Sequence, residues 1–161
     1  MDDPQHLVCL SLGSNIAPAD NLKQALELLR RELTVLAVSR AWRTPAVGSQ
    51  GPDFLNAAVL VHAPQPVSQL KSQVLRDIEA RLGRIRGEDK YAPRTIDIDI
   101  VVDSEQVVDP ELWKHAHLAQ PVAELLPDLV DPTSGQTLEA IAKRLRPLAG
   151  IRPCPEMLEC E

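Results

Sequence analysis

The chain has 161 residues, of which 44% are hydrophobic and 25% are charged, and its formal net charge is −6. This composition predicts a globular protein, and the negative charge argues against a general nucleic-acid-binding surface. The N-terminus, MDDPQH, is acidic and precedes only a short apolar run, so we expect neither a signal peptide nor a membrane anchor. The three cysteines show no zinc-ligand spacing and fit a reduced, cytoplasmic protein.

Hydrophobic patterning predicts six regular elements in the first hundred residues. They are a strand at 6–12, a helix that begins near Pro18, strands at 33–44 and 54–62, a helix from Pro66 to about Leu82, and a strand at 95–102. The order β-α-β-β-α-β is that of a ferredoxin-like α+β sandwich, in which two helices cover one face of an antiparallel sheet. The other face is left for a ligand or for further chain.

Beyond residue 103 the pattern is weaker. We expect a short edge strand at 106–108, short helices at 121–126 and 138–144, and a frayed tail from Pro153. The whole chain, 1–161, is predicted to form a single domain with long loops and this C-terminal extension.

Two carboxylates alternate with isoleucines in the segment TIDIDIVV, residues 95–102. Residues i and i+2 of a strand point to the same side, so Asp97 and Asp99 share the face opposite the isoleucines. Mg²⁺ takes one or two protein carboxylates together with phosphate oxygens and waters. The alternative is an ordinary amphipathic strand whose aspartates face solvent.

Basic residues gather just before this strand: Arg81, Arg84, Arg86, Lys90 and Arg94. Arginines offer planar forks to phosphate oxygens, and carboxylates for magnesium beside them are the parts of phosphoryl-transfer chemistry. A solvated helix end would explain Arg81 and in part Arg84, but it explains Arg94 poorly. The sequence contains no GxxxxGK[ST] and no GxGxxG phosphate-binding loop.

Five segments taken together resemble one family. They are LSLGSN ending at Asn15, RTPAVGSQGPDFLNAAV (43–59), IEARLGRIR (78–86), PRTIDIDIVV (93–102) and PVAELLPDLVDP (121–132). In this order they are similar to the 6-hydroxymethyl-7,8-dihydropterin pyrophosphokinases of folate biosynthesis, over residues 7 to about 140. The resemblance implies a ferredoxin-like fold and transfer of pyrophosphate from ATP to a pterin alcohol, which releases AMP.

The resemblance also implies the following roles, all by position in this sequence. Asp97 and Asp99 would be the ligands of two Mg²⁺ ions, and Arg84 and Arg94 would be catalytic residues that bind the phosphates and close the loops. The ATP site would also include Arg86, Glu79 and His115. The pterin pocket would be formed by Thr44, Pro45, Val47, Phe54 and Asn56. The implied partners are ATP and the pterin, with no nucleic acid and no membrane, and the chain is expected to be a monomer or weak dimer.

The residue types fit the pterin-pocket roles. Phe54 is the only phenylalanine and offers a stacking face to a flat ring, while the amide of Asn56 both donates and accepts hydrogen bonds. The alternatives are that Phe54 is a core residue and Asn56 a turn residue. For Glu79 the alternative is a solvated helix residue.

The match departs from the family pattern in WKHAHLAQPVAELL, residues 113–126, where the family has an arginine and a second pterin-stacking phenylalanine. His115 or His117 is left for the histidine role, and Trp113 is either a replacement aromatic wall or a core residue. No general base is evident. Two other functions therefore stay open: a pterin- or nucleotide-binding paralogue without turnover, and a pyrophosphokinase for a different alcohol.

Overall fold

The computed structural model describes residues 6–45, 53–83 and 96–154. In chain order the first elements are β1 (His6–Ser14), α1 (Pro18–Glu32), β2 (Thr34–Val38), β3 (Trp42–Thr44) and β4 (Phe54–Ala63). One helical segment follows, made of α2 (Val67–Gln69), the π-helical turn η1 (Leu70–Leu75) and α3 (Arg76–Arg81). The remaining elements are β5 (Asp97–Asp103), β6 (Gln106–Val107), the 3₁₀ turn η2 (Pro110–Trp113), α4 (Ala116–Leu125), α5 (Leu138–Ala149) and β7 (Arg152–Pro153).

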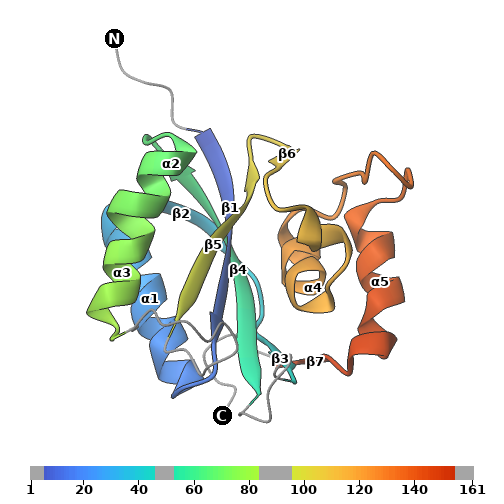
Figure 1. Ribbon diagram of the computed structural model, residues 1–161, viewed down its shortest axis with the longest axis horizontal. Helices are drawn as coiled ribbons and strands as arrows, with labels where there is room; N and C mark the ends of the chain where they lie inside the picture. The colour runs from blue at the N-terminus through green and yellow to red at the C-terminus, as the bar shows by residue number, and fades with distance from the viewer. Residues whose placement is uncertain (1–5, 46–52, 84–95, 155–161) are drawn as a thin grey trace.

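The strands form one antiparallel sheet in the order β6-β5-β1-β4-β3-β7, with β2 also paired to β4. Helix α1 and the α2–η1–α3 segment lie on one side of the sheet, and α4 and α5 lie on the other (Figure 1). The predicted ferredoxin-like β-α-β-β-α-β unit is therefore confirmed. The second sheet face is covered in part by the C-terminal chain.

The first face carries the larger core. Strand β1 lies between β4 and β5, and its residues Val8, Leu10 and Leu12 are fully buried there. Helix α1 begins with Pro18 in its first turn, and its apolar stripe covers these strand residues. The helical stripe consists of Leu22, Ala25, Leu26 and Leu29.

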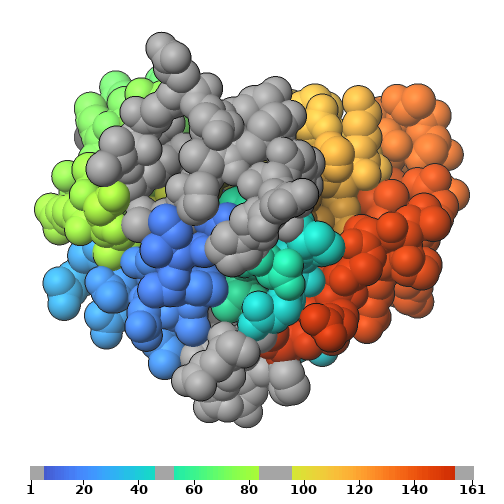
Figure 2. All heavy atoms as spheres, turned by 60° about the horizontal axis from the view of Figure 1, so that its bottom comes forward, coloured from blue at the N-terminus to red at the C-terminus, as the bar shows by residue number. Residues whose placement is uncertain are grey.

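The second face carries a separate cluster beneath α4 and α5. Cys9 of β1 and Val101 and Val102 of β5 pack there against Leu112 and the helix residues Leu118, Ala119 and Val122. In the space-filling view the C-terminal segments form one flank of the molecule, and α1 and α3 lie on the opposite flank (Figure 2). The C-terminal chain thus supplies its own hydrophobic contacts to the sheet.

Trp42 of β3 contacts both helices of the C-terminal layer. Its side chain is fully buried, and its indole N–H donates to Glu124 of α4 at 2.8 Å. The guanidinium groups of Arg40 and Arg146 lie 5.2 and 5.1 Å from the centre of the ring, within cation–π range. Arg40 also donates to Glu124 at 2.7 Å, so α4, α5 and β3 meet at one side chain.

Three predicted elements are wrong in detail. The expected strand at 33–44 is two strands, and between them the side-chain hydroxyl of Ser39, in place of a backbone carbonyl, accepts the Ala58 N–H at 2.8 Å. The helix expected at 121–126 begins at Ala116 and contains Pro121 within it, which the sequence suggested as a start. Pro153, the first residue of the expected frayed tail, pairs with Trp42 of β3, and residues 155–161 lie outside the described residues.

The cysteines also differ from expectation. Cys9 is free and buried, and burial raises the pKa of its thiol to about 12. Cys154 is disulfide-bonded, against the prediction of reduced thiols, because sequence spacing alone does not determine pairing. No helix in the described residues is long and apolar enough to cross a membrane.

Candidate functional site

The two aspartates of the segment TIDIDIVV lie on β5, as the alternation of isoleucine and aspartate predicts. Ile96 and Ile98 are fully buried in the core of the first face, and Asp97 and Asp99 point to the second face. Asp97 lies opposite Gly13 of β1, and Asp99 lies opposite Ser11. The side-chain face predicted from the sequence is confirmed.

A row of paired residues connects these carboxylates with β4. Gly13 lies opposite both Asp97 on β5 and Asn56 on β4, and Asn56 in turn lies opposite Trp42 on β3. Directly paired residues of neighbouring strands project to the same side of a sheet. Asp97 and Asn56 are therefore two strand spacings apart on one face, a separation of about 10 Å.

Gly13 leaves the room in which the Asn56 amide lies. A Cβ at this position would lie 3.0 Å from the Asn56 side-chain oxygen and 3.7 Å from the Phe54 ring. The Asn56 amide nitrogen donates to the Thr44 hydroxyl at 2.8 Å. Both polar side chains are buried, so Asn56 is a fixed strand residue and the alternative of a turn residue is wrong.

The other predicted pterin-pocket residues lie at the ends of the same hairpin. Phe54 is half-buried and pairs with Thr44, and Pro45 follows Thr44 and is exposed. Phe54 is absent from the buried core residues, so the alternative of a core role does not hold. Val47 lies outside the described residues, as do Arg84, Arg86 and Arg94.

Glu79 belongs to the helical segment that runs along the free edge of β5. It is 1% exposed, and its carboxylate accepts the backbone N–H of Ile98 at 2.9 Å. The alternative of a solvated helix residue is therefore wrong. Its predicted ATP contact stays a prediction.

Lys71, eight residues earlier, is a contact that the sequence reading missed. Its ammonium donates to the Ile98 carbonyl and to the Asp99 carboxylate, each at 2.8 Å. The motif pattern gave no signal for this residue, because it lies in a π-helical turn that changes the helical phase.

The electrostatics of Asp99 follow from these neighbours. Desolvation raises the pKa of its carboxyl, and the negative charge of Asp97 raises it further. The hydrogen bond and charge of Lys71 act in the opposite direction, while Glu79 adds a smaller upward contribution. The negative charges of Asp97 and Asp99 thus repel each other, and the ammonium of Lys71 offsets part of this repulsion.

The two histidines of the divergent segment lie at the start of α4. His115 is exposed and hydrogen-bonded to Glu111 at 2.7 Å, and its ring centre is 5.5 Å from that of His117. His117 is half-buried, and desolvation followed by the charge of His115 lowers its pKa to about 4. Asp97 acts on His117 in the opposite sense, so His117 lies within electrostatic range of the carboxylate pair. The predicted ATP contact of His115 stays a prediction.

Trp113 packs against the second-face cluster and is partly buried. This contact supports the core alternative for Trp113 over the replacement aromatic wall.

The donor set suits a cation that keeps other ligands. Among the described residues no group of three or more histidine, cysteine, aspartate or glutamate side chains is arranged to hold a metal ion. Two carboxylates on one strand face, Asp97 and Asp99, are the hard oxygen ligands that Mg²⁺ shares with substrate phosphates and water. The residues present therefore fit magnesium held jointly with a substrate.

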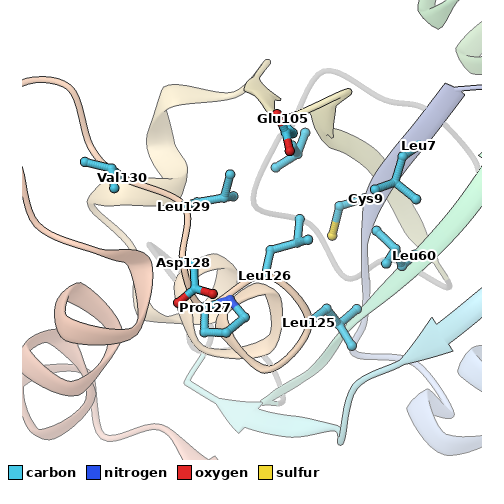
Figure 3. Close-up of a pocket in the computed structure, with 11 residues that line it drawn as sticks. Leu7, Cys9, Leu60, Glu105, Leu125, Leu126, Pro127, Asp128, Leu129 and Val130 are labelled. Atoms are coloured by element: carbon cyan, nitrogen blue, oxygen red, sulfur yellow. The ribbon is translucent and has the colours of Figure 1, made fainter.

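A cavity of about 440 Å³ lies on the same sheet face at the other end of β1 (Figure 3). Its wall is largely apolar and combines strand residues with the chain after α4. The lining is Leu7, Cys9, Leu60, Val102, Glu105, Leu125, Leu126, Pro127, Asp128, Leu129 and Val130. Of the predicted site residues that the structure describes, none is among these lining residues.

Residues 9–127 match the family model of 7,8-dihydro-6-hydroxymethylpterin-pyrophosphokinase (HPPK). The chain belongs to this family. Curated relatives carry the name 2-amino-4-hydroxy-6-hydroxymethyldihydropteridine pyrophosphokinase. The protein of Synechocystis sp. is 34% identical over 85% of this chain and 76% of its own length. That of Methylorubrum extorquens is 40% identical over 83% of this chain and 90% of its own length.

Solved structures support the fold. The Plasmodium falciparum HPPK-DHPS structure with pteroate aligns with a TM-score of 0.69 and 11% sequence identity. The alignment covers 89% of this chain and 45% of that chain, so this chain spans less than half of that protein. At this identity the similarity establishes the shared fold alone.

Proposed function

We propose that this chain transfers the pyrophosphoryl group of ATP to 6-hydroxymethyl-7,8-dihydropterin and releases AMP, in folate biosynthesis. The observation that carries the proposal is the row Asp97–Gly13–Asn56, which places a carboxylate and a side-chain amide on one sheet face. Family membership supports the same reaction.

The pterin would lie along β4. Asn56 is preorganised by its bond to Thr44, so its carbonyl oxygen is directed toward the space above Gly13 and can accept from a ring N–H. The half-buried ring of Phe54 offers one stacking face. The hydroxymethyl group would then point along the row toward Asp97.

The ATP phosphates would lie over β5. Asp97 and Asp99 would hold magnesium, which when bound neutralises the negative charge that repels an incoming oxygen. The hydroxymethyl oxygen would form a bond to the β-phosphorus as its proton passes to water, the bond from that phosphorus to the α-phosphate oxygen would break, and AMP would leave. The two carboxylates and Asn56 contribute by fixing both reactants within about 10 Å of each other on a rigid sheet.

The test is to incubate the protein with Mg²⁺-ATP, with and without 6-hydroxymethyl-7,8-dihydropterin, and to identify the nucleotide product. We expect AMP that depends on the pterin. A pterin-dependent ADP signal would contradict the reaction type. Absence of any pterin-dependent product would favour a binding paralogue or a different alcohol acceptor.

A further inference from the structure

Two side chains bind the edge of β5 that faces away from β1, beside the carboxylates. Ile98 lies opposite Leu12 of β1, and β6 pairs only with Val102 and Asp103, farther along β5. The N–H of Ile98 donates to Glu79, and its carbonyl accepts from Lys71. Both backbone groups of this residue thus find partners in the helical segment, which fixes the position of the two neighbouring aspartates.

The π-helical turn brings the two clamping residues to one side of the helix. Lys71 and Glu79 are eight residues apart, which in a regular α-helix places them about 80° apart around the axis. The turn at Leu70–Leu75, in which the Arg76 N–H bonds to the Lys71 carbonyl, absorbs one extra residue. The remaining offset is about 20°, so both side chains face β5.

Lys71 does more than close the edge. Its ammonium also bonds the Asp99 carboxylate at 2.8 Å, and both side chains remain partly exposed, by 27% and 47% respectively. A clamp for the Ile98 carbonyl would need only a neutral donor. The positive charge is placed where two carboxylates that repel each other share one strand face.

We propose that Lys71, set in register by the π-helical turn, is a built-in counter-cation that positions Asp99 and lowers the affinity of the Asp97–Asp99 pair for a free divalent cation. The inference rests on the metal role given to the two aspartates in the proposed function. The lysine holds the carboxylate pair in place before a metal–substrate complex arrives. It also disfavours tight capture of the metal alone.

The test is direct binding of Mn²⁺, without nucleotide, followed by the free-ion signal in electron paramagnetic resonance. We expect Lys71→Met to bind Mn²⁺ at least about fivefold more tightly than the unchanged protein at about 0.1 M salt, since a unit positive charge near the ion is removed. Lys71→Arg, which keeps the charge, should bind within about twofold of the unchanged protein, by the same Coulomb reasoning.

Lys143→Met is the matched control, because it removes the same charge from an exposed pair with Glu139 on α5. It should leave Mn²⁺ affinity unchanged. Equal affinities for Lys71→Met and Lys143→Met, weaker binding by Lys71→Met, or no binding by either would overturn the inference. Circular dichroism of Lys71→Met checks that it folds; should it not, tight binding by Lys71→Arg relative to the unchanged protein would overturn the inference by itself. The proposed function is judged separately, by pterin-dependent AMP from the unchanged protein.

Discussion

The two ends of one sheet face have opposite characters although they belong to the same strands. At one end β1, β4 and β5 present Gly13, Asn56 and Asp97. At the other end β1 and β5 present Cys9 and Val102, which pack beneath α4. A strand face is therefore not polar or apolar as a whole, because its character changes along the strands.

We expect one end of the sheet face to contribute mainly to stability and the other mainly to activity. The apolar end gains stability from the burial of residues such as Val101, Leu112 and Val122. The polar end retains buried or half-buried groups such as Asn56 and Asp99, which are costly to place in a core. Changes at the polar end should affect activity far more than folding, and changes at the apolar end should do the reverse.

The largest expected effect is at the polar end. Asp97→Asn should reduce kcat by at least about 10²–10³-fold, since it removes a charge directed at the reacting phosphates. Pterin binding, measured by fluorescence titration, should change little because Asn56 and Thr44 are untouched. Asp128→Asn, at the cavity on the apolar end, is the matched control and should keep full kcat. Normal turnover by Asp97→Asn would refute the metal assignment.

At the apolar end, Leu112→Ala should lower the free energy of unfolding by about 2–5 kcal/mol, because it leaves a cavity under α4. Urea unfolding followed by circular dichroism measures this loss. Activity per folded molecule should stay near that of the unchanged protein. Leu148→Ala, whose side chain is 81% exposed, should be nearly neutral in the same measurement. A large loss of kcat in folded Leu112→Ala would contradict the expectation that the apolar end affects stability and not activity.

His117 lies where the two ends meet, and its lowered pKa makes a pH test possible. Burial and the charge of His115 hold the pKa at about 4, below the unfolded value of about 6.5. The unfolded chain therefore binds a proton that the folded chain does not, and stability should be lost as pH falls from 6.5 toward 4. The loss attributable to this residue is on the order of 3 kcal/mol.

Urea unfolding at several pH values, without divalent cations, measures this dependence, and His117→Gln should flatten it. NMR titration of the ring gives the pKa itself. In His115→Gln the pKa of His117 should rise, because a neighbouring positive charge is gone. A His117 pKa near 6.5 in the unchanged protein would mean that the ring is solvated and not at the boundary of the cluster.

The smallest expected effect tests the close approach at Gly13. Gly13→Ala places a methyl group 3.0 Å from the Asn56 oxygen and should raise KM for the pterin about tenfold, which corresponds to about 1.4 kcal/mol. The free energy of unfolding should change by less than about 1 kcal/mol, since only a side-chain amide must move. Gly135→Ala is the contrasting control: φ there is +75°, so it should cost stability and leave KM unchanged. An unchanged KM in Gly13→Ala would separate Asn56 from pterin binding.

Much of this protein can be predicted from local pattern. The alternation of isoleucine and aspartate predicted strand β5 and the face on which its carboxylates lie. The apolar stripe from Leu22 to Leu29 predicted helix α1. The order of the elements gave the ferredoxin-like sheet, because the connections between consecutive elements admit few topologies. These features depend on residues near one another in the chain.

The tertiary structure alone decided the rest, because it depends on contacts between distant residues. The hydroxyl of Ser39 accepts the Ala58 N–H where a predicted strand divides in two, and the indole of Trp42 donates to Glu124 of α4. The most consequential case is Lys71. Because a π-helical turn shifts the phase of this helical segment, regular α-helical periodicity does not predict that the Lys71 ammonium bonds the Asp99 carboxylate. The sequence determined which strand face carries the two carboxylates, and the fold decided that the Lys71 ammonium accompanies Asp99.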